Sequence, residues 1–170
     1  MEEKKTVLIF PWAKALRNGN ENPKNYPYWK DLVELLRGNN YHVVQISLLH
    51  EKEIGADERR SLVYKQVCAL INEGPLIITI DSFAQHLCWS LGKKCIVLWG
   101  PSDPLVFGHP CHINLQKDRK FIREGFRHFD TWESCELCPE AFVSPVEVVQ
   151  ALSAFQARPQ ELSSVVDRSS

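Results

Sequence analysis

The sequence predicts an α/β fold in which one parallel sheet carries helices on both faces, the Rossmann-like, doubly wound arrangement. Short apolar runs of strand type alternate with stretches of helical periodicity along most of the chain. Two of these runs, residues 76–80 and 95–99, are apolar without alternation, as expected of strands covered on both faces. The 170 residues are enough for one domain with a real core and too few for two.

The first half of the chain supplies two strands and two helices. Residues 7–12 form a short apolar strand, and residues 26–37 form an amphipathic helix because their apolar positions recur at spacings of three and four. Residues 42–47 are the second strand. A polar, irregular segment follows, and residues 61–72 then regain a helical pattern that a Gly-Pro pair ends.

The second half continues the alternation. Residues 76–80 and 95–99 are the two buried strands, with a short helix over residues 83–91 between them. Residues 113–115 add a short edge strand. Residues 144–155 close the domain as a helix, with serine as its N-cap, proline at the first helical position and glutamate at the third. This order favours right-handed crossovers between parallel strands.

Composition restricts the class of protein. Hydrophobic residues make up 44% and charged residues 24%, the balance of a soluble globular domain, and the net charge of −1 gives no reason to expect nucleic acid. Residues 117–128 are locally basic and are expected to form a solvated face.

No apolar run is long enough to span a bilayer and no signal peptide is visible, so the expected location is the cytoplasm. Residues 1–156 are expected to form the domain, and residues 157–170 a disordered tail.

Six cysteines without a signal peptide favour reduced thiols over a disulfide framework. Cys135 and Cys138 are spaced as half of a zinc site or a redox switch. A closed zinc site needs two more ligands, and the candidates are His109, Cys111, His112 and His128. Free thiols are the favoured interpretation, so no metal and no cofactor are expected.

Polar residues follow both buried strands at the point where each strand ends. Asp81 and Ser82 come directly after residues 76–80 and begin the next helix, whose free N–H groups favour an anion. His86 lies one helical turn further along. The corresponding place after residues 95–99 is occupied by Gly100, Pro101, Ser102 and Asp103. Because parallel strands end at one edge, the sequence predicts a phosphate site there.

Lys24, in the loop after the first strand, is expected to add a positive charge to the same site. Each of these residues also has an ordinary structural interpretation. Asp81 or Ser82 can cap a helix, His86 can be an interior histidine, and the Gly-Pro-Ser-Asp-Pro segment can be a turn. Their joint position at one sheet edge is what favours a binding site.

The segment ITIDSFAQHLCWSLGKKCIVLWGPSDP, residues 78–104, resembles the nucleotide-sugar signature of glycosyltransferase family 9, the ADP-heptose:lipopolysaccharide heptosyltransferases. The opening PWAKALRNGNENPKNYPYWKDLVELL, residues 11–36, is similar to the start of that family's C-terminal domain, and the resemblance extends over residues 7–152. It implies the C-terminal half of a GT-B glycosyltransferase, in which Asp81, Ser82 and His86 hold the diphosphate and the neighbouring sugar. Lys24 would contact phosphate, and Gly100, Pro101, Ser102 and Asp103 would line the nucleotide cleft.

Two departures from the family pattern matter. Phe83 replaces the usual glycine and places an aromatic ring against the ligand or narrows its approach. The family has two Rossmann-like domains, and this sequence resembles only the second, so the base that activates the acceptor hydroxyl is not among its matched residues. Glu51, Glu53 and Asp57 are candidates for binding ribose or sugar hydroxyls, although solvated loop charges are the more ordinary interpretation.

Three functions therefore remain open. The leading hypothesis is a glycosyltransferase-like domain that binds an ADP-, UDP- or GDP-linked sugar and transfers it with an acceptor domain from another chain or a second copy of itself. The second is a non-catalytic module that binds a nucleotide or nucleotide sugar. The third is a degenerate domain that acts as an interaction surface.

Overall fold

Six parallel strands form one sheet in the order β3-β2-β1-β4-β5-β6 in the computed structural model, which describes residues 4–123 and 135–157. The chain starts in the middle of the sheet, moves outward through β2 and β3, returns to the other side of β1 and moves outward again. This confirms the predicted doubly wound α/β class. The strands are β1 (Lys5–Phe10), β2 (Tyr41–Ile46), β3 (Glu58–Arg60), β4 (Leu76–Ile80), β5 (Ile96–Trp99) and β6 (Ile113–Gln116).

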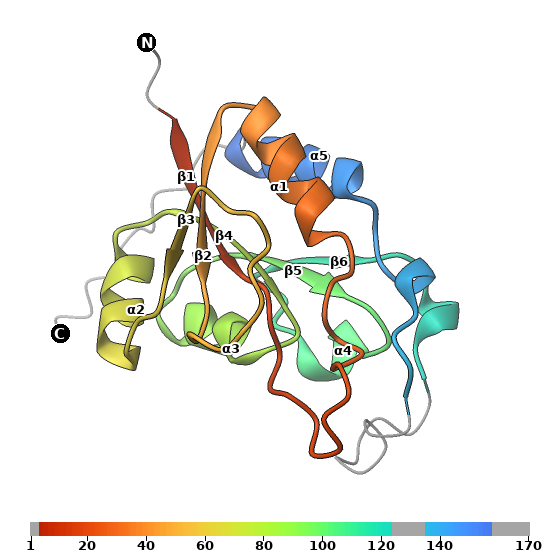
Figure 1. Ribbon diagram of the computed structural model, residues 1–170. Helices are drawn as coiled ribbons and strands as arrows, with labels where there is room; N and C mark the ends of the chain where they lie inside the picture. Colours follow the sequence, from red (N-terminus) through yellow and green to blue (C-terminus); the bar gives the residue numbers. More distant parts are fainter. Residues whose placement is uncertain (1–3, 124–134, 158–170) are drawn as a thin grey trace, which may run out of the picture.

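Helices cover both faces of the sheet, as Figure 1 shows, with α1 and α5 together on one face and α2 and α3 on the other. The pairing of α1 with α5 is the most extensive helix–helix contact among the described residues. The α-helices are α1 (Trp29–Gly38), α2 (Tyr64–Asn72), α3 (Phe83–Ser90), α4 (Pro104–Phe107) and α5 (Pro145–Ala157), and two short 3₁₀ turns span Arg119–Phe121 and Pro139–Ala141.

The alternation of side chains along β1 explains the two layers of core. Val7 and Ile9 point toward α1 and α5, whereas Leu8 and Phe10 point toward α2 and α3. The first three of these side chains are fully buried and Phe10 is nearly so. A strand that is apolar on both faces is stable only when both faces are covered, which is why unbroken apolar runs predicted the fold correctly.

The final helix begins as its sequence predicts. The N–H and Oγ of Ser144 each donate to Oε2 of Glu147 at 2.7 Å, and the N–H of Glu147 lies 3.4 Å from Oγ of Ser144. This is a reciprocal capping box, and the hydrogen bonds from Ser144 hold the pKa of Glu147 below its usual range. The helix runs through Ala157, one residue beyond the predicted domain limit.

One strand and one α-helix of the described residues were absent from the sequence prediction, as were the two 3₁₀ turns. The edge strand β3 reads Glu-Arg-Arg, and its charges made the segment look like a loop, but charged residues are common on edge strands because they discourage pairing with other chains. The short α4 begins at Pro104, the last residue of the Gly-Pro-Ser-Asp-Pro segment, for which a turn was the alternative interpretation. The first helix also begins at Trp29 rather than at residue 26, since Pro27 lies just before it.

Some expectations concern residues outside the described part of the chain. The predicted tail lies almost wholly in residues 158–170, and the basic segment is described only as far as residue 123. In the described part of the chain, no helix combines the length and apolar character that a bilayer crossing requires.

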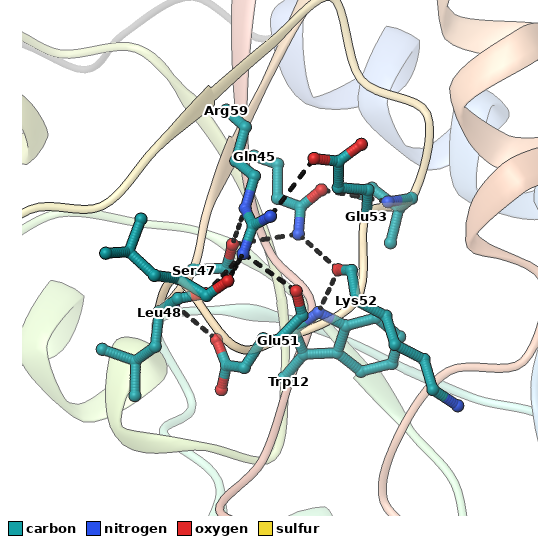
Figure 2. A network of polar contacts seen from close by, with 10 residues as sticks. Trp12, Gln45, Ser47, Leu48, Glu51, Lys52, Glu53 and Arg59 are labelled. Carbon is teal, nitrogen blue, oxygen red and sulfur yellow. Dashed lines mark hydrogen bonds and ion pairs between the residues drawn. The ribbon is translucent and has the colours of Figure 1, made fainter.

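The loop after β2 is held by Arg59 of β3 (Figure 2). The guanidinium donates to Oγ of Ser47 at 3.0 Å and to Oε1 of Glu53 at 3.2 Å. It also donates to the backbone carbonyls of Leu48, Leu49 and Glu51. One side chain therefore satisfies five acceptors of a segment that has no regular structure of its own.

Gln45 completes this network from inside the sheet. Its side chain is 1% exposed, donates to the carbonyl of Lys52 at 2.8 Å and accepts the N–H of Ile54 at 3.0 Å. The indole N–H of Trp12 donates to the same Lys52 carbonyl at 2.9 Å (Figure 2). The loops that follow β1 and β2 are thereby joined at the carboxyl edge of the sheet.

Replacement of Arg59 by lysine is expected to lower the free energy of unfolding by about 1–2 kcal/mol. The single ammonium group of lysine cannot reach all five acceptors that the planar guanidinium group of Arg59 contacts. Urea denaturation measures the change. The matched control is Arg60→Lys, whose guanidinium bonds to Glu58 and is expected to cost less than about 0.5 kcal/mol. Equal losses in the two variants would contradict the bracing role of Arg59.

Candidate anion-binding site at the carboxyl edge of the sheet

The strand order creates a switch point between β1 and β4. The chain leaves β1 toward β2 on one side and leaves β4 toward β5 on the other, so the loops after these neighbouring strands diverge. Ligands of doubly wound proteins bind in the crevice that such divergence opens at the carboxyl ends of the strands. Predicted site residues lie in both loops: Lys24 follows β1, and Asp81 and Ser82 follow β4.

Lys24 and Asp81 meet across this switch point. The Nζ of Lys24 lies 3.0 Å from Oδ2 of Asp81, and their side chains are 22% and 6% exposed. The amide of Gln85, which is fully buried, donates to Oδ1 of Asp81 at 3.0 Å. The carboxylate therefore has a cation on one oxygen and an amide on the other, which is what a buried charge requires. Gln85 was not predicted, since it resembles any interior residue of a helix.

Two buried asparagines shape the loop that presents Lys24. The side chain of Asn22 accepts the N–H of Lys24 at 3.0 Å and donates to the carbonyl of Lys14 at 2.9 Å. The side chain of Asn25 accepts the N–H of Ala13 at 3.0 Å. These bonds fold the loop back on itself, so the lysine stands on an ordered segment despite the absence of helix or strand.

The amino end of α3 carries no side-chain cap. Ser82 is the N-cap residue, but its Oγ lies 3.2 Å from Oγ1 of Thr79 and makes no capping bond. Ser82 thus occupies the N-cap position, but its side chain does not cap the helix. The first N–H groups of α3 keep their capacity to bind an anion, and the helix dipole adds to it.

Phe83 occupies the first position of α3 and is 57% exposed. Its ring meets Phe10 edge to face, with centroids 6.2 Å apart. Phe83, which replaces the family's glycine, is therefore exposed next to the switch point, and its ring packs against Phe10, the last residue of β1.

The segment after β5 has mainly packing contacts. A Cβ added to Gly100 would lie 2.3 Å from the ring of Phe142, so the absence of a side chain makes room for that ring. Pro101 and Ser102 are buried, and the Ser102 hydroxyl has no hydrogen-bond partner among the described residues. The predicted lining role of these residues stays a prediction.

Asp103 is already engaged. Its carboxylate accepts the N–H of Leu105 at 3.0 Å, which caps α4, and pairs with both terminal nitrogens of Arg119 at 3.1 and 2.9 Å. The bond to Arg119 holds the pKa of Asp103 below its usual range. Asp103 thus orders the loop in this structure and leaves little acceptor capacity for a ligand.

His86 lies on the exposed side of α3, so the alternative of an interior histidine is wrong. Its Nδ1 lies 2.8 Å from Nε2 of His109, which follows α4. From the sequence, His109 was a candidate only as a zinc ligand. In the sequence of α3, His86 lies one helical turn after Ser82.

A hollow of about 570 Å³ opens beside the Lys24 loop at the same edge. Its walls come from the loops after β1 and β2 and from the start of α1. The residues that line it are Trp12, Glu21, Tyr26, Pro27, Tyr28, Trp29, Lys30, Asp31, Lys52, Glu53, Ile54 and Leu137. Four of these residues are aromatic and five are charged, so the hollow offers ring faces to an organic ligand among several polar groups.

The three acidic candidates for binding sugar hydroxyls, Glu51, Glu53 and Asp57, lie between β2 and β3. Asp57 lies at the opposite edge of the sheet, where it pairs with Arg37 and accepts the N–H of Val43, so it is remote from the switch point. Glu51 accepts the N–H of Leu48, and Glu53 pairs with Arg59 and lines the hollow. Among these acidic residues, only Glu53 borders the hollow.

All six cysteines are free thiols. Cys135 is buried beside Leu16, and burial raises the pKa of its thiol, while Cys138 contacts Glu140. Within residues 4–123 and 135–157, no three His, Cys, Asp or Glu side chains are placed to hold a metal ion. His128, one of the zinc candidates, lies outside these residues.

The sequence model of glycosyltransferase family 9 (heptosyltransferase) matches residues 2–123. The chain belongs to this family. Three solved structures share its fold: ADP-heptose lps heptosyltransferase II of E. coli (TM-score 0.60, 18% identity), an E. coli heptosyltransferase with ADP (0.60, 15%) and the glycosyl transferase family 9 from Veillonella parvula DSM 2008 (0.58, 17%). No curated protein sequence matches the chain.

This chain corresponds to only part of each of those structures. The alignments cover 91%, 89% and 91% of this chain but 47%, 44% and 47% of the respective solved chains. The chain therefore spans less than half the length of the glycosyltransferases it matches, consistent with the C-terminal-type half of the fold.

Gly100→Ala is expected to lower the free energy of unfolding by about 1–3 kcal/mol, because the added methyl would overlap the Phe142 ring. Gly38→Ala is the control, since a Cβ at that position in α1 meets nothing within 4 Å. Urea denaturation compares the two. A Gly100→Ala protein as stable as Gly38→Ala would show that Phe142 moves aside freely.

Lys24→Met is expected to lower the free energy of unfolding by about 2 kcal/mol, because it leaves the buried carboxylate of Asp81 without its cation. Adding Asp81→Asn is expected to recover more than half of this loss, since a neutral amide needs no counter-charge. A double-mutant cycle measured by urea denaturation gives the coupling. Additive losses would show that the two side chains do not depend on each other.

Proposed function

We propose that this chain binds the diphosphate of a nucleotide sugar at the switch point and acts as the donor-binding half of a glycosyltransferase. The observation that carries the proposal is the position of Lys24 against Asp81 beside the uncapped start of α3. An ammonium group and a helix amino end are both well suited to binding a phosphate. The cytoplasm, where free thiols persist, is the proposed location.

Asp81 has a supporting role in this proposal. Its buried carboxylate fixes the ammonium of Lys24 and the amide of Gln85, so it orients positive and donor groups rather than accepting a proton. A diphosphate leaving group needs this kind of preorganised positive field. The hollow beside the Lys24 loop has room and aromatic faces for the rest of the nucleotide.

Sugar transfer also requires a base at the acceptor hydroxyl. Among the described residues of the site, the carboxylates are tied: Asp81 by Lys24 and Gln85, and Asp103 by Arg119. We therefore assign the base and the acceptor to a second Rossmann-like half, supplied by another chain or by another copy of this one. The same observation favours a second candidate function, a module that binds a nucleotide sugar without transferring it.

Calorimetry with ADP, UDP and GDP tests the proposal. At least one of them is expected to bind more tightly than millimolar, and His86→Ala is expected to weaken it by about 1–2 kcal/mol, the scale of a hydrogen bond to a charged group. Lys94→Met, an exposed change just before β5 at the far edge of the sheet, is the control and should bind normally.

Failure of all three nucleotides to bind at millimolar concentration would contradict the proposal. A nucleotide sugar that binds but is neither hydrolysed nor transferred would favour the non-catalytic module. Turnover that disappears in Asp81→Asn would instead favour the transferase.

A further inference from the structure

Three aromatic side chains join α3 to the segment after α4. His86 and Trp89 lie on α3, and the ring of His109 stands between them. The His109 ring is stacked on the Trp89 ring, with centroids 4.5 Å apart and planes 5° apart, and its Nε2 lies 2.8 Å from Nδ1 of His86. A ring held by a stack on one side and a hydrogen bond on the other has little rotational freedom.

The backbone at His109 is fixed as well. Its carbonyl accepts the side-chain amide of Asn114 at 3.0 Å, and the same amide's oxygen accepts the indole N–H of Trp99 at 2.8 Å. Just before it, a Cβ at Gly108 would lie 2.5 Å from the carbonyl oxygen of Pro104, so the chain passes too close to α4 for a side chain there. His109 is therefore a preorganised neighbour of His86.

The titratable groups around this pair are few. His112 lies behind His109, with ring centroids 5.5 Å apart, and has Cys111 beside its Nδ1 and the Gln85 carbonyl 2.8 Å from its Nε2. Burial and the neighbouring His86 lower the pKa of His109, and burial foremost lowers that of His112. The lowered pKa of His109 favours its neutral ring, which can accept a hydrogen bond at one of its two nitrogens.

The protonation state of an imidazole decides whether each of its ring nitrogens donates or accepts a hydrogen bond. A neutral histidine has one donor and one acceptor nitrogen, whereas an imidazolium donates from both. An anion at Nε2 of His86 favours its charged form, and that form needs an acceptor for its Nδ1 proton. The Nε2 of His109 lies at hydrogen-bond distance from that nitrogen.

We propose that His109, held by Trp89, is the positioning residue of His86 and couples binding of the diphosphate to uptake of one proton by the His86 imidazole. The inference rests on the proposed function, in which His86 contacts that diphosphate. It adds a pH dependence: the nucleotide binds more tightly where a proton is available to His86, and this gain falls away as the pH rises.

Calorimetry with ADP in buffers of different ionisation enthalpy measures the protons taken up on binding. His109→Phe keeps a ring for the stack but removes the acceptor. It is expected to bind ADP about three- to tenfold more weakly than the wild type near pH 6.5, with less proton uptake, and within about twofold of it near pH 8.5. His109→Gln retains an acceptor and should recover part of the loss. His42→Gln, at the opposite edge of the sheet, is the control.

Nitrogen-15 NMR of the imidazoles in the free protein separates this inference from the proposed function. In the wild type, the His86 Nδ1 resonance is expected to lie at the chemical shift of a hydrogen-bonded nitrogen, and in His109→Phe it is expected to shift toward that of a nitrogen without this partner. If ADP does not bind but this shift is seen, the proposed function fails and the pairing stands. If ADP binds and His109→Phe matches the wild type in affinity, proton uptake and the chemical shift of the His86 Nδ1 resonance, the inference is overturned.

Discussion

The contact between Lys24 and Asp81 is the interaction around which the candidate site is organised. It joins the loops of two neighbouring strands that lead to opposite sides of the sheet, so it exists only because the sheet is wound outward from its centre. A carboxylate with 5% of its surface exposed would be costly without a cation beside it. The ion pair between Lys24 and Asp81 therefore contributes both to the candidate site and to the stability of the fold.

The sequence predicted the parts of the molecule that depend on local pattern. The unbroken apolar runs identified β4 and β5, and serine, proline and glutamate in order identified the start of α5 and its capping box. Because parallel strands end at one edge, it also placed Lys24 and Asp81 at the same edge without any knowledge of strand order. The structure then brought these two into contact at 3.0 Å.

What the sequence could not predict depends on contacts between distant residues. β3 is a strand because β2 lies beside it, and its three charged residues have no strand pattern of their own. His109 acquires its role from His86, which lies 23 residues away along the chain and is brought near by the fold. The close packing at Gly100 could not be predicted either, because a Cβ there would meet the ring of Phe142, which lies 42 residues further along the chain.

The Phe142 ring also shows that residues beyond the end of the family match pack against the carboxyl edge of the sheet. The family match stops at residue 123, yet Phe142 comes from the segment that leads into α5 and fills the space over Gly100. The adjoining Val143 carbonyl accepts the buried hydroxyl of Tyr26, and α5 packs on α1. A chain cut at residue 123 would lose the cover of two loops at the carboxyl edge at once. The last helix is therefore a structural support for the site, although it contributes none of the residues proposed to bind the ligand.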